Sequence, residues 1–157
     1  MYDPNITSTG HQPYYFDQMT ALYDHYCVIG SQIEVTYVAA DDNQASIHIS
    51  LSVDDNNTQT TNNPLAIAEM PDSVYDFVGT QTGEQRKLVM NWSAKKYFGK
   101  NPLANTELQG TSAANPEEQS YYYINIKSAD AVNSALYITV KVSYIAIWKE
   151  LKEVSQS

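Results

Sequence analysis

The stretch LYITVKVSYIAIW, residues 136–148, decides the fold of this chain. Apolar or aromatic residues stand at every second position from Leu136 to Trp148. An amphipathic helix would repeat its apolar residues about every 3.6 positions, so a period of two held over this length predicts a long β-strand. Ile145 and Ile147 make the opposite face apolar as well. We therefore expect the second half of this strand to be shielded from water on both faces.

Shorter runs of the same alternation predict further strands. They cover residues 32–37, 46–53, 87–92 and 122–126, with weaker candidates at 74–79 and just before Tyr26. Helical signals are sparse: Asp17 can cap a short helix, and Ser93 can cap a single turn at 94–98 that ends at Gly99. Long turn-rich segments join the strands. We expect an all-β fold, a two-sheet jelly-roll sandwich with one or two short helical turns.

Length and composition fit a single domain over residues 1–157. The chain is 43% hydrophobic and 17% charged, which is too apolar for a disordered acidic tail. No apolar run approaches the length of a membrane span, and the first residues lack the basic segment of a signal peptide, so we expect no membrane partner. Cys27 is the single cysteine, which excludes an intramolecular disulfide framework and any CxxC site.

The charges are unevenly distributed along the chain. Arg86 is the first basic residue, and the net charge of −9 comes entirely from the acidic segment before it. An acidic protein repels phosphate at long range, so the whole molecule does not resemble a typical nucleic-acid binder. The simplest interpretation is one acidic and one nearly neutral solvated surface, and the alternative is two surfaces that face different compartments.

One group of basic residues is a candidate nucleic-acid-facing patch. It consists of Arg86, Lys87, Lys95, Lys96 and Lys100. Tyr97 and Phe98 interleave with these residues, and nucleic-acid bases can stack on aromatic rings. The competing interpretation is a turn in which lysine stems cover buried aromatic side chains. Of the two tryptophans, Trp92 and Trp148, we expect each to anchor the core from a strand.

Few residues suggest metal binding or catalysis. The weak calcium candidates are two aspartate pairs at strand ends, Asp41 with Asp42 and Asp54 with Asp55. Turns favour aspartate in any case, and the EF-hand spacing is absent. His25 and Cys27 stand two residues apart, which is a weak zinc signal without a third ligand. The sequence contains no phosphate-binding loop and no GxGxxG, HExxH or GxSxG motif. We expect no metal, no cofactor and no enzymatic activity.

A long motif near the start of the chain carries a family resemblance. It runs from Gly10 to Ser31 as GHQP-x-x-FDQ-x-x-x-LY-x-HY-x-V-x-GS. With the preceding residues from Tyr2, it resembles the capsid proteins of circular Rep-encoding single-stranded DNA viruses (CRESS-DNA, circo-like). The segments SAKKYFG, residues 93–99, and YIAIWKE, residues 144–150, also look like that family.

The resemblance implies a jelly roll of the viral coat type. About sixty copies would close into an icosahedral shell around a circular single-stranded DNA genome, with different patches of each subunit in contact. It implies self-assembly into the virion or virus-like particles, passage through the host nucleus during assembly, and recognition of a host receptor that the sequence does not identify. The abundance of tyrosine, thirteen residues, fits such contacts, because tyrosine is common at interfaces.

The chain departs from that family at its start. Family members usually begin with an arginine-rich arm that binds the genome, followed by a first strand. Here the GHQP motif begins at Gly10, and the shell would be acidic because each copy carries −9. We expect that the chain lacks an upstream basic arm and first strand, and that the arm would make the main DNA contacts.

Two other functions remain open from the sequence. The first is a jelly-roll carbohydrate-binding module, similar to a lectin, that holds sugar with aromatic and Asn/Asp loops. The second is an enzyme of cupin type, which would need several histidines around one metal and fits the three scattered histidines poorly. Closed shells in electron microscopy would favour the capsid, and glycan-binding monomers would favour the lectin.

Overall fold

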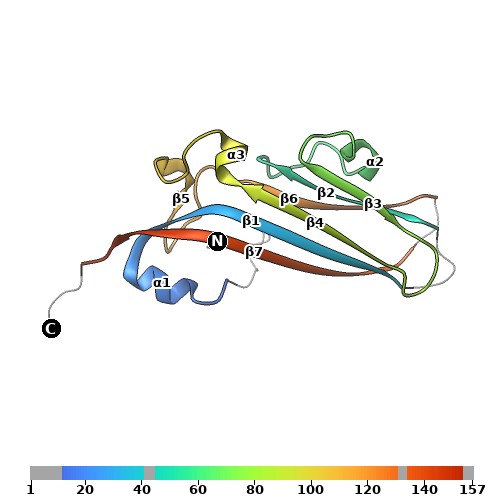
Figure 1. Ribbon diagram of the computed structural model, residues 1–157, viewed down its shortest axis with the longest axis horizontal. Helices are drawn as coiled ribbons and strands as arrows, with labels where there is room; N and C mark the ends of the chain where they lie inside the picture. Colours follow the sequence, from blue (N-terminus) through green and yellow to red (C-terminus); the bar gives the residue numbers. More distant parts are fainter. Residues whose placement is uncertain (1–11, 41–44, 131–133, 154–157) are drawn as a thin grey trace. The chain divides into compact units, whose positions relative to one another are not determined.

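The computed structural model describes residues 12–40, 45–130 and 134–153 (Figure 1). The chain divides into two compact units: unit 1 comprises Met1–Ser31, Trp92–Gln119 and Tyr144–Ser157, and unit 2 comprises Gln32–Asn91 and Ser120–Ser143. Three strands contribute residues to both units: β1 (Tyr23–Ala39), β4 (Gln85–Ser93) and β7 (Leu136–Leu151). The expectation of one domain over residues 1–157 stays a prediction.

Two sheets form the framework. One sheet has the strand order β3-β2-β6, where β2 is Ile47–Asp54, β3 is Ser73–Val78 and β6 is Tyr121–Ser128. Both pairings are antiparallel, and Ile49 of β2 lies opposite Asp76 on one side and Ile126 on the other. The other sheet joins β4, β1 and the short β5 (Gln109–Gly110), with β7 also paired to β1. The predicted fold class, an all-β two-sheet jelly-roll sandwich, is confirmed. The described residues contain more short helical elements than the one or two turns that we expected.

The core of unit 2 lies between its two layers, the strands β2, β3 and β6 on one side and β1, β4 and β7 on the other (Figure 1). It is built from the apolar positions of the alternating runs, since successive strand side chains point to opposite faces. Its fully or largely buried members are Ile33, Val35, Tyr37, Ala39, Ile47, Ile49, Leu51, Val78, Leu88 and Met90. Burial raises the pKa of the Tyr37 hydroxyl. Its oxygen has no hydrogen-bond partner in the described residues.

The outer face of the β3-β2-β6 sheet is covered by α2 (Pro64–Ile67). Proline suits the first turn of a helix because that position needs no backbone donor. Ser50 and Asn125 are register partners on this face and both are buried. Sequence alternation predicted β2 and β6 but gave no sign of the helix, which is a single turn between turn-rich segments.

Unit 1 contains the other short helices, α1 (Phe16–Leu22), α3 (Ala94–Phe98) and the 3-10 turn η1 (Thr106–Leu108). Helix α3 ends, as predicted, at Gly99, whose φ of 66° is the left-handed conformation that glycine tolerates. The predicted cap of α1 is wrong. Tyr15 occupies the cap position with a φ of 68°, and Asp17 lies in the first turn, where its charge complements the helix dipole.

One burial prediction for the long strand is wrong. We expected the second half of β7 to be shielded from water on both faces, but the side chain of Ile145 is 64% exposed. Alternation shows that both faces are apolar, and it does not show whether a second layer covers them. None of the helices in the described part of the chain has the length and apolarity needed to span a bilayer.

Candidate nucleic-acid and assembly surfaces

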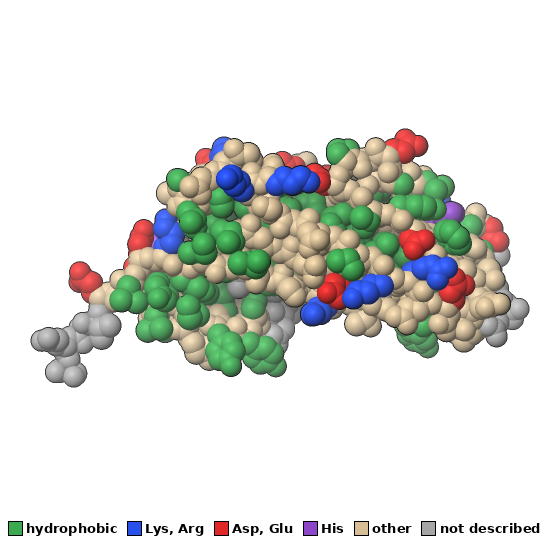
Figure 2. Space-filling view, in the orientation of Figure 1, with side chains coloured by type: hydrophobic (Ala, Val, Ile, Leu, Met, Phe, Trp, Pro, Cys, Tyr) green, Lys and Arg blue, Asp and Glu red, His purple; other side chains and the backbone are tan. Residues whose placement is uncertain are grey.

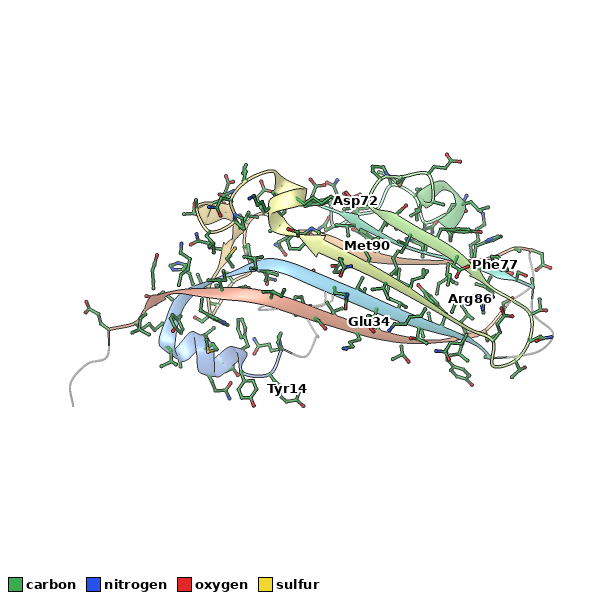
Figure 3. All side chains as sticks on the ribbon, viewed as in Figure 1. Tyr14, Glu34, Asp72, Phe77, Arg86 and Met90 are labelled. Atoms are coloured by element: carbon green, nitrogen blue, oxygen red, sulfur yellow. The ribbon has the colours of Figure 1, made fainter. Side chains whose placement is uncertain are left out.

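Two of the five basic candidates lie on β4 in unit 2, and both are ion-paired. Arg86 Nη2 lies 2.7 Å from Glu84 Oε1, and its Nε lies 3.8 Å from Asp76 Oδ2. Lys87 Nζ lies 2.6 Å from Glu34 Oε2. Figure 3 labels Glu34 and Arg86, and Figure 2 shows blue and red side chains side by side over these strands. Each positive charge is thus matched locally by a carboxylate, which weakens its attraction for phosphate.

The ion pair on Lys87 changes the acidity of its partner. Hydrogen bonding and attraction to the Lys87 ammonium hold the pKa of the Glu34 carboxyl below its ordinary value. The carboxylate therefore stays ionised to lower pH than a free glutamate would.

The other three basic candidates, Lys95, Lys96 and Lys100, belong to unit 1. Lys95 and Lys96 are exposed on α3, where Figure 2 shows blue side chains gathered. Lys100 Nζ lies 3.4 Å from Glu107 Oε2. The five residues fall in two different units, so a single patch containing all of them stays a prediction. Within unit 1 all three lysines are exposed, and Lys95 and Lys96 stand next to each other on α3.

Helix α3 and the end of β4 together contribute a group of three aromatic rings, Tyr97 and Phe98 from the helix and Trp92 from the strand. Ring centroids are 6.3 Å apart for Trp92 and Tyr97, 6.1 Å for Trp92 and Phe98, and 5.2 Å for Tyr97 and Phe98. The rings are half-buried and pack largely against one another. This arrangement fixes α3 on the end of β4 and leaves limited ring surface on which a base could stack. Phosphate contact by Lys95 and Lys96 is the chemistry that the segment offers best.

Trp148 is the centre of a second aromatic group in unit 1. Its ring centroid lies 5.7 Å from Phe16, 6.4 Å from Tyr23 and 5.6 Å from Tyr26. Phe16 and Tyr26 are themselves buried and meet edge to face at 5.5 Å. Trp148 is half-buried, so it joins α1, β1 and the end of β7 through one part of its ring.

Of the two aspartate pairs that the sequence offers as weak calcium candidates, the structure describes one. Asp41 and Asp42 lie outside the described residues. Asp54 Oδ1 accepts hydrogen bonds from the backbone N–H and the side-chain amide of Asn56, and Asp55 Oδ1 accepts from the same amide. The backbone bond lowers the pKa of the Asp54 carboxyl below its ordinary value. These carboxylates therefore stabilise a turn.

His25 and Cys27 are adjacent on one strand face by parity, but they engage different groups. His25 Nδ1 lies 2.9 Å from Glu150 Oε2. Cys27 is buried, and its thiol donates to the Pro102 carbonyl oxygen at 3.4 Å. Burial also raises the pKa of the Cys27 thiol, which disfavours the thiolate that a metal would need. In the described ranges, no three His, Cys, Asp or Glu side chains are grouped as a metal site.

The sequence did not identify a set of large apolar side chains that the structure leaves exposed. In unit 1 these are Tyr14, Tyr15, Leu22, Ile145 and Leu151, and in unit 2 they include Phe77, Ile126, Tyr137, Ile138 and Val140. Figure 2 shows apolar side chains gathered over α1, and Figure 3 labels Tyr14 beside that helix. Alternation assigned Ile126, Ile138 and Ile145 to strand faces but could not show that those faces lack a cover.

Comparison with known proteins gives weak structural neighbours. No protein-family model matches the chain, and no curated protein sequence matches it. A chain of Desmodium yellow mottle tymovirus aligns with a TM-score of 0.42 and 12% identity, over 92% of this chain and 76% of that chain. A chain from the cryo-EM structure of rhinovirus-B5 aligns with a TM-score of 0.42 and 10% identity, over 89% and 58%. Both neighbours come from viruses, and alignments at this level carry no functional conclusion.

Proposed function

We propose that this chain is a structural protein, the capsid subunit of a CRESS-DNA virus. Its copies self-assemble into an icosahedral shell around a circular single-stranded DNA genome, in the virion and, during assembly, in the host nucleus. The motif from Gly10 to Ser31 supports this function, and so does the two-sheet sandwich. The role is assembly, without enzymatic turnover.

The observation that carries the proposal is the exposure of large aromatic and aliphatic side chains on both units. In unit 1, Tyr14 is 87% exposed and Leu151 is 66% exposed, and in unit 2 Tyr137 is 69% exposed. Large apolar side chains left exposed are common at protein contact sites, and tyrosine is enriched there. A subunit that meets several copies of itself needs such surfaces on more than one side.

Electron microscopy and sedimentation of the purified chain test the proposal together. We expect closed particles, or large assemblies that grow with protein concentration. A protein that stays monomeric over the whole concentration range would contradict the proposal. A monomer that binds a defined glycan would favour the carbohydrate-binding module instead.

The genome contact is proposed to involve the exposed lysines of α3. Changing Lys95→Gln and Lys96→Gln together should weaken single-stranded DNA binding and reduce the salt dependence of log K by about 1.4, since each lysine that neutralises a phosphate adds roughly 0.7 to the slope. Lys87→Gln is the control, because Lys87 lies on β4 in unit 2, outside the α3 segment. An equal weakening in the control would contradict a specific role for α3. Fluorescence anisotropy with a labelled oligonucleotide at several salt concentrations makes the measurement.

A further inference from the structure

The outer face of the β3-β2-β6 sheet carries, near one end, a row of three side chains from its three strands. Phe77 of β3 and Lys127 of β6 are the register partners of His48 on β2, one on each side. Register partners in antiparallel strands point to the same face of a sheet, so the three side chains form one cross-strand row. His48 alternates with the core residues Ile47 and Ile49, which places the row on the face away from the core.

The two outer members of the row are accessible and differ in chemistry. Phe77, labelled in Figure 3, is 48% exposed, and Lys127 is also exposed. No ion pair involves Lys127 in the described part of the chain, whereas Arg86 and Lys87 of the same unit are paired with carboxylates. The row thus offers an aromatic ring and an unmatched positive charge on either side of an imidazole.

A neighbouring tyrosine holds the imidazole of His48 in place. His48 Nδ1 lies 2.6 Å from the Tyr75 hydroxyl, and the two rings stack with centroids 5.9 Å apart. When the hydroxyl donates this bond, the proton of the neutral imidazole is on Nε2. The second ring nitrogen is then a donor for a ligand.

The next row on this face contains two buried polar groups without partners. Ser50 and Asn125 are register partners, and they are 0% and 6% exposed. The Ser50 hydroxyl and the Asn125 amide nitrogen have no hydrogen-bond partner among the described residues. Buried polar groups nearly always have a partner, whether protein, ligand or ordered water. Both groups can donate, as His48 and Lys127 can, so the two rows together favour a ligand rich in acceptors.

Negative charge on this face is confined to the other end of the strands. Among the outward-pointing residues of the three strands, Asp54 is the only acid. It is six residues from His48, roughly 20 Å along β2, and its carboxylate accepts hydrogen bonds from Asn56. An anion at the Lys127 end is therefore attracted without close repulsion from the strands beneath it.

We propose that the row of His48, Phe77 and Lys127 binds a nucleotide unit of single-stranded DNA. A nucleotide carries a flat aromatic base beside a negatively charged phosphate, so one unit meets both outer members of the row. The base stacks on the Phe77 ring, and the phosphate accepts hydrogen bonds from the Lys127 ammonium and from His48 Nε2. Ser50 and Asn125 are the donors next to that phosphate, through a bound water. The site rests on the proposed shell around single-stranded DNA and adds a contact in unit 2 to that of α3.

Substitution of the two outer side chains tests the site. Lys127→Gln should weaken binding of a short oligodeoxythymidine and lower the salt dependence of log K by about 0.7, the value for one phosphate contact on a single strand. Phe77→Leu keeps an apolar side chain but removes the ring, and should weaken binding by about fivefold or more. Fluorescence anisotropy at several salt concentrations makes the measurement, and circular dichroism verifies that the variants fold.

The other sheet of unit 2 supplies matched controls. Lys141→Gln on β7 and Val89→Ala on β4 change exposed residues of the same kinds and should alter binding far less. Equal losses in the site and control variants would overturn the proposal, and so would a parent chain that does not bind the oligonucleotide.

A photochemical cross-link locates the base. An oligonucleotide with an iodinated deoxyuridine reacts on irradiation with an aromatic ring that stacks on the base, and mass spectrometry identifies the modified residue. We expect the cross-link at Phe77 and its loss in Phe77→Leu. Cross-linking at Tyr97 or Phe98 of α3, with none at Phe77, would overturn the site in unit 2.

A sulfated sugar supplies negative charge without a base. A heparin oligosaccharide should therefore bind more weakly than an oligodeoxythymidine of equal charge. Tighter heparin binding that is lost in Phe77→Leu and Lys127→Gln would identify a sulfated glycan as the ligand and overturn the assignment to DNA.

The outcomes separate this site from the proposed function. Shells that form while the Phe77 and Lys127 variants bind DNA as the parent does would overturn the site and leave the capsid role standing. A cross-link at Phe77 in a chain that never forms shells would support the site and contradict the capsid role.

Discussion

At the scale of single residues, Trp148 shows how one half-buried ring joins distant parts of unit 1. Its contacts are with Phe16 of α1 and with Tyr23 and Tyr26 of β1. Removing the ring leaves a cavity among three other rings, so Trp148→Ala should lower the free energy of unfolding by about 3 kcal/mol. Leu151→Ala is the control, because Leu151 is exposed and should cost far less. Urea denaturation gives both values, and a similar small change for the two variants would show that Trp148 does not anchor unit 1.

Glu34 is the residue whose titration most directly reports an ion pair. Its pKa is lowered in the folded chain by Lys87, so the pair contributes stability above the ordinary glutamate pKa and loses it as pH falls through the folded value. Lys87→Met should raise the pKa of Glu34 toward the ordinary value. Carboxyl chemical shifts followed by NMR make the measurement. The prediction is wrong if the Glu34 midpoint stays where it is in the parent chain.

At the scale of elements, the contact between β5 and β1 depends on a glycine. Gly110 is paired with Tyr26, and a Cβ placed on it would overlap the tyrosine ring. Gly110→Ala should therefore destabilise unit 1 by about 1–3 kcal/mol through overpacking. At Gly30 a Cβ would come only to 3.4 Å from the Trp92 carbonyl oxygen, so Gly30→Ala should cost less. Thermal unfolding measures the destabilisation caused by each variant. A larger loss for Gly30→Ala than for Gly110→Ala would show that the β5 segment can shift away from Tyr26.

Strand alternation predicted the elements best where apolar residues repeat over a long run. The strands β4, β6 and β7 cover the predicted runs, β2 covers its run except for Ser46, and β1 extends the predicted 32–37 run back to Tyr23. The short elements α2, η1 and β5 were missed, because one turn or two residues are too short for any period to develop. The site was harder to predict, because Arg86 and Lys87 have carboxylate partners on other strands, Asp76 of β3 and Glu34 of β1, which only the folded chain brings near them.

At the scale of the whole molecule, the two compact units share strands. Each of β1, β4 and β7 runs without interruption from one unit into the other. Trp92 and Trp148 both belong to unit 1, so tryptophan fluorescence reports that unit, whereas far-ultraviolet circular dichroism reports all strands. Because continuous strands couple the units, the two signals should change at the same urea concentration. Separate midpoints would show that the units unfold independently.

The single cysteine offers a further use of the native chain. Cys27 is fully enclosed, and its thiol is held against the Pro102 carbonyl oxygen. A reagent such as a chromogenic aromatic disulfide can modify it only while unit 1 is transiently open, so the rate of colour development measures how often that opening occurs. The native thiol thus reports the rate at which unit 1 opens locally, without any engineered label. Because Cys27 is enclosed, a maleimide dye would react first with any cysteine introduced at the surface.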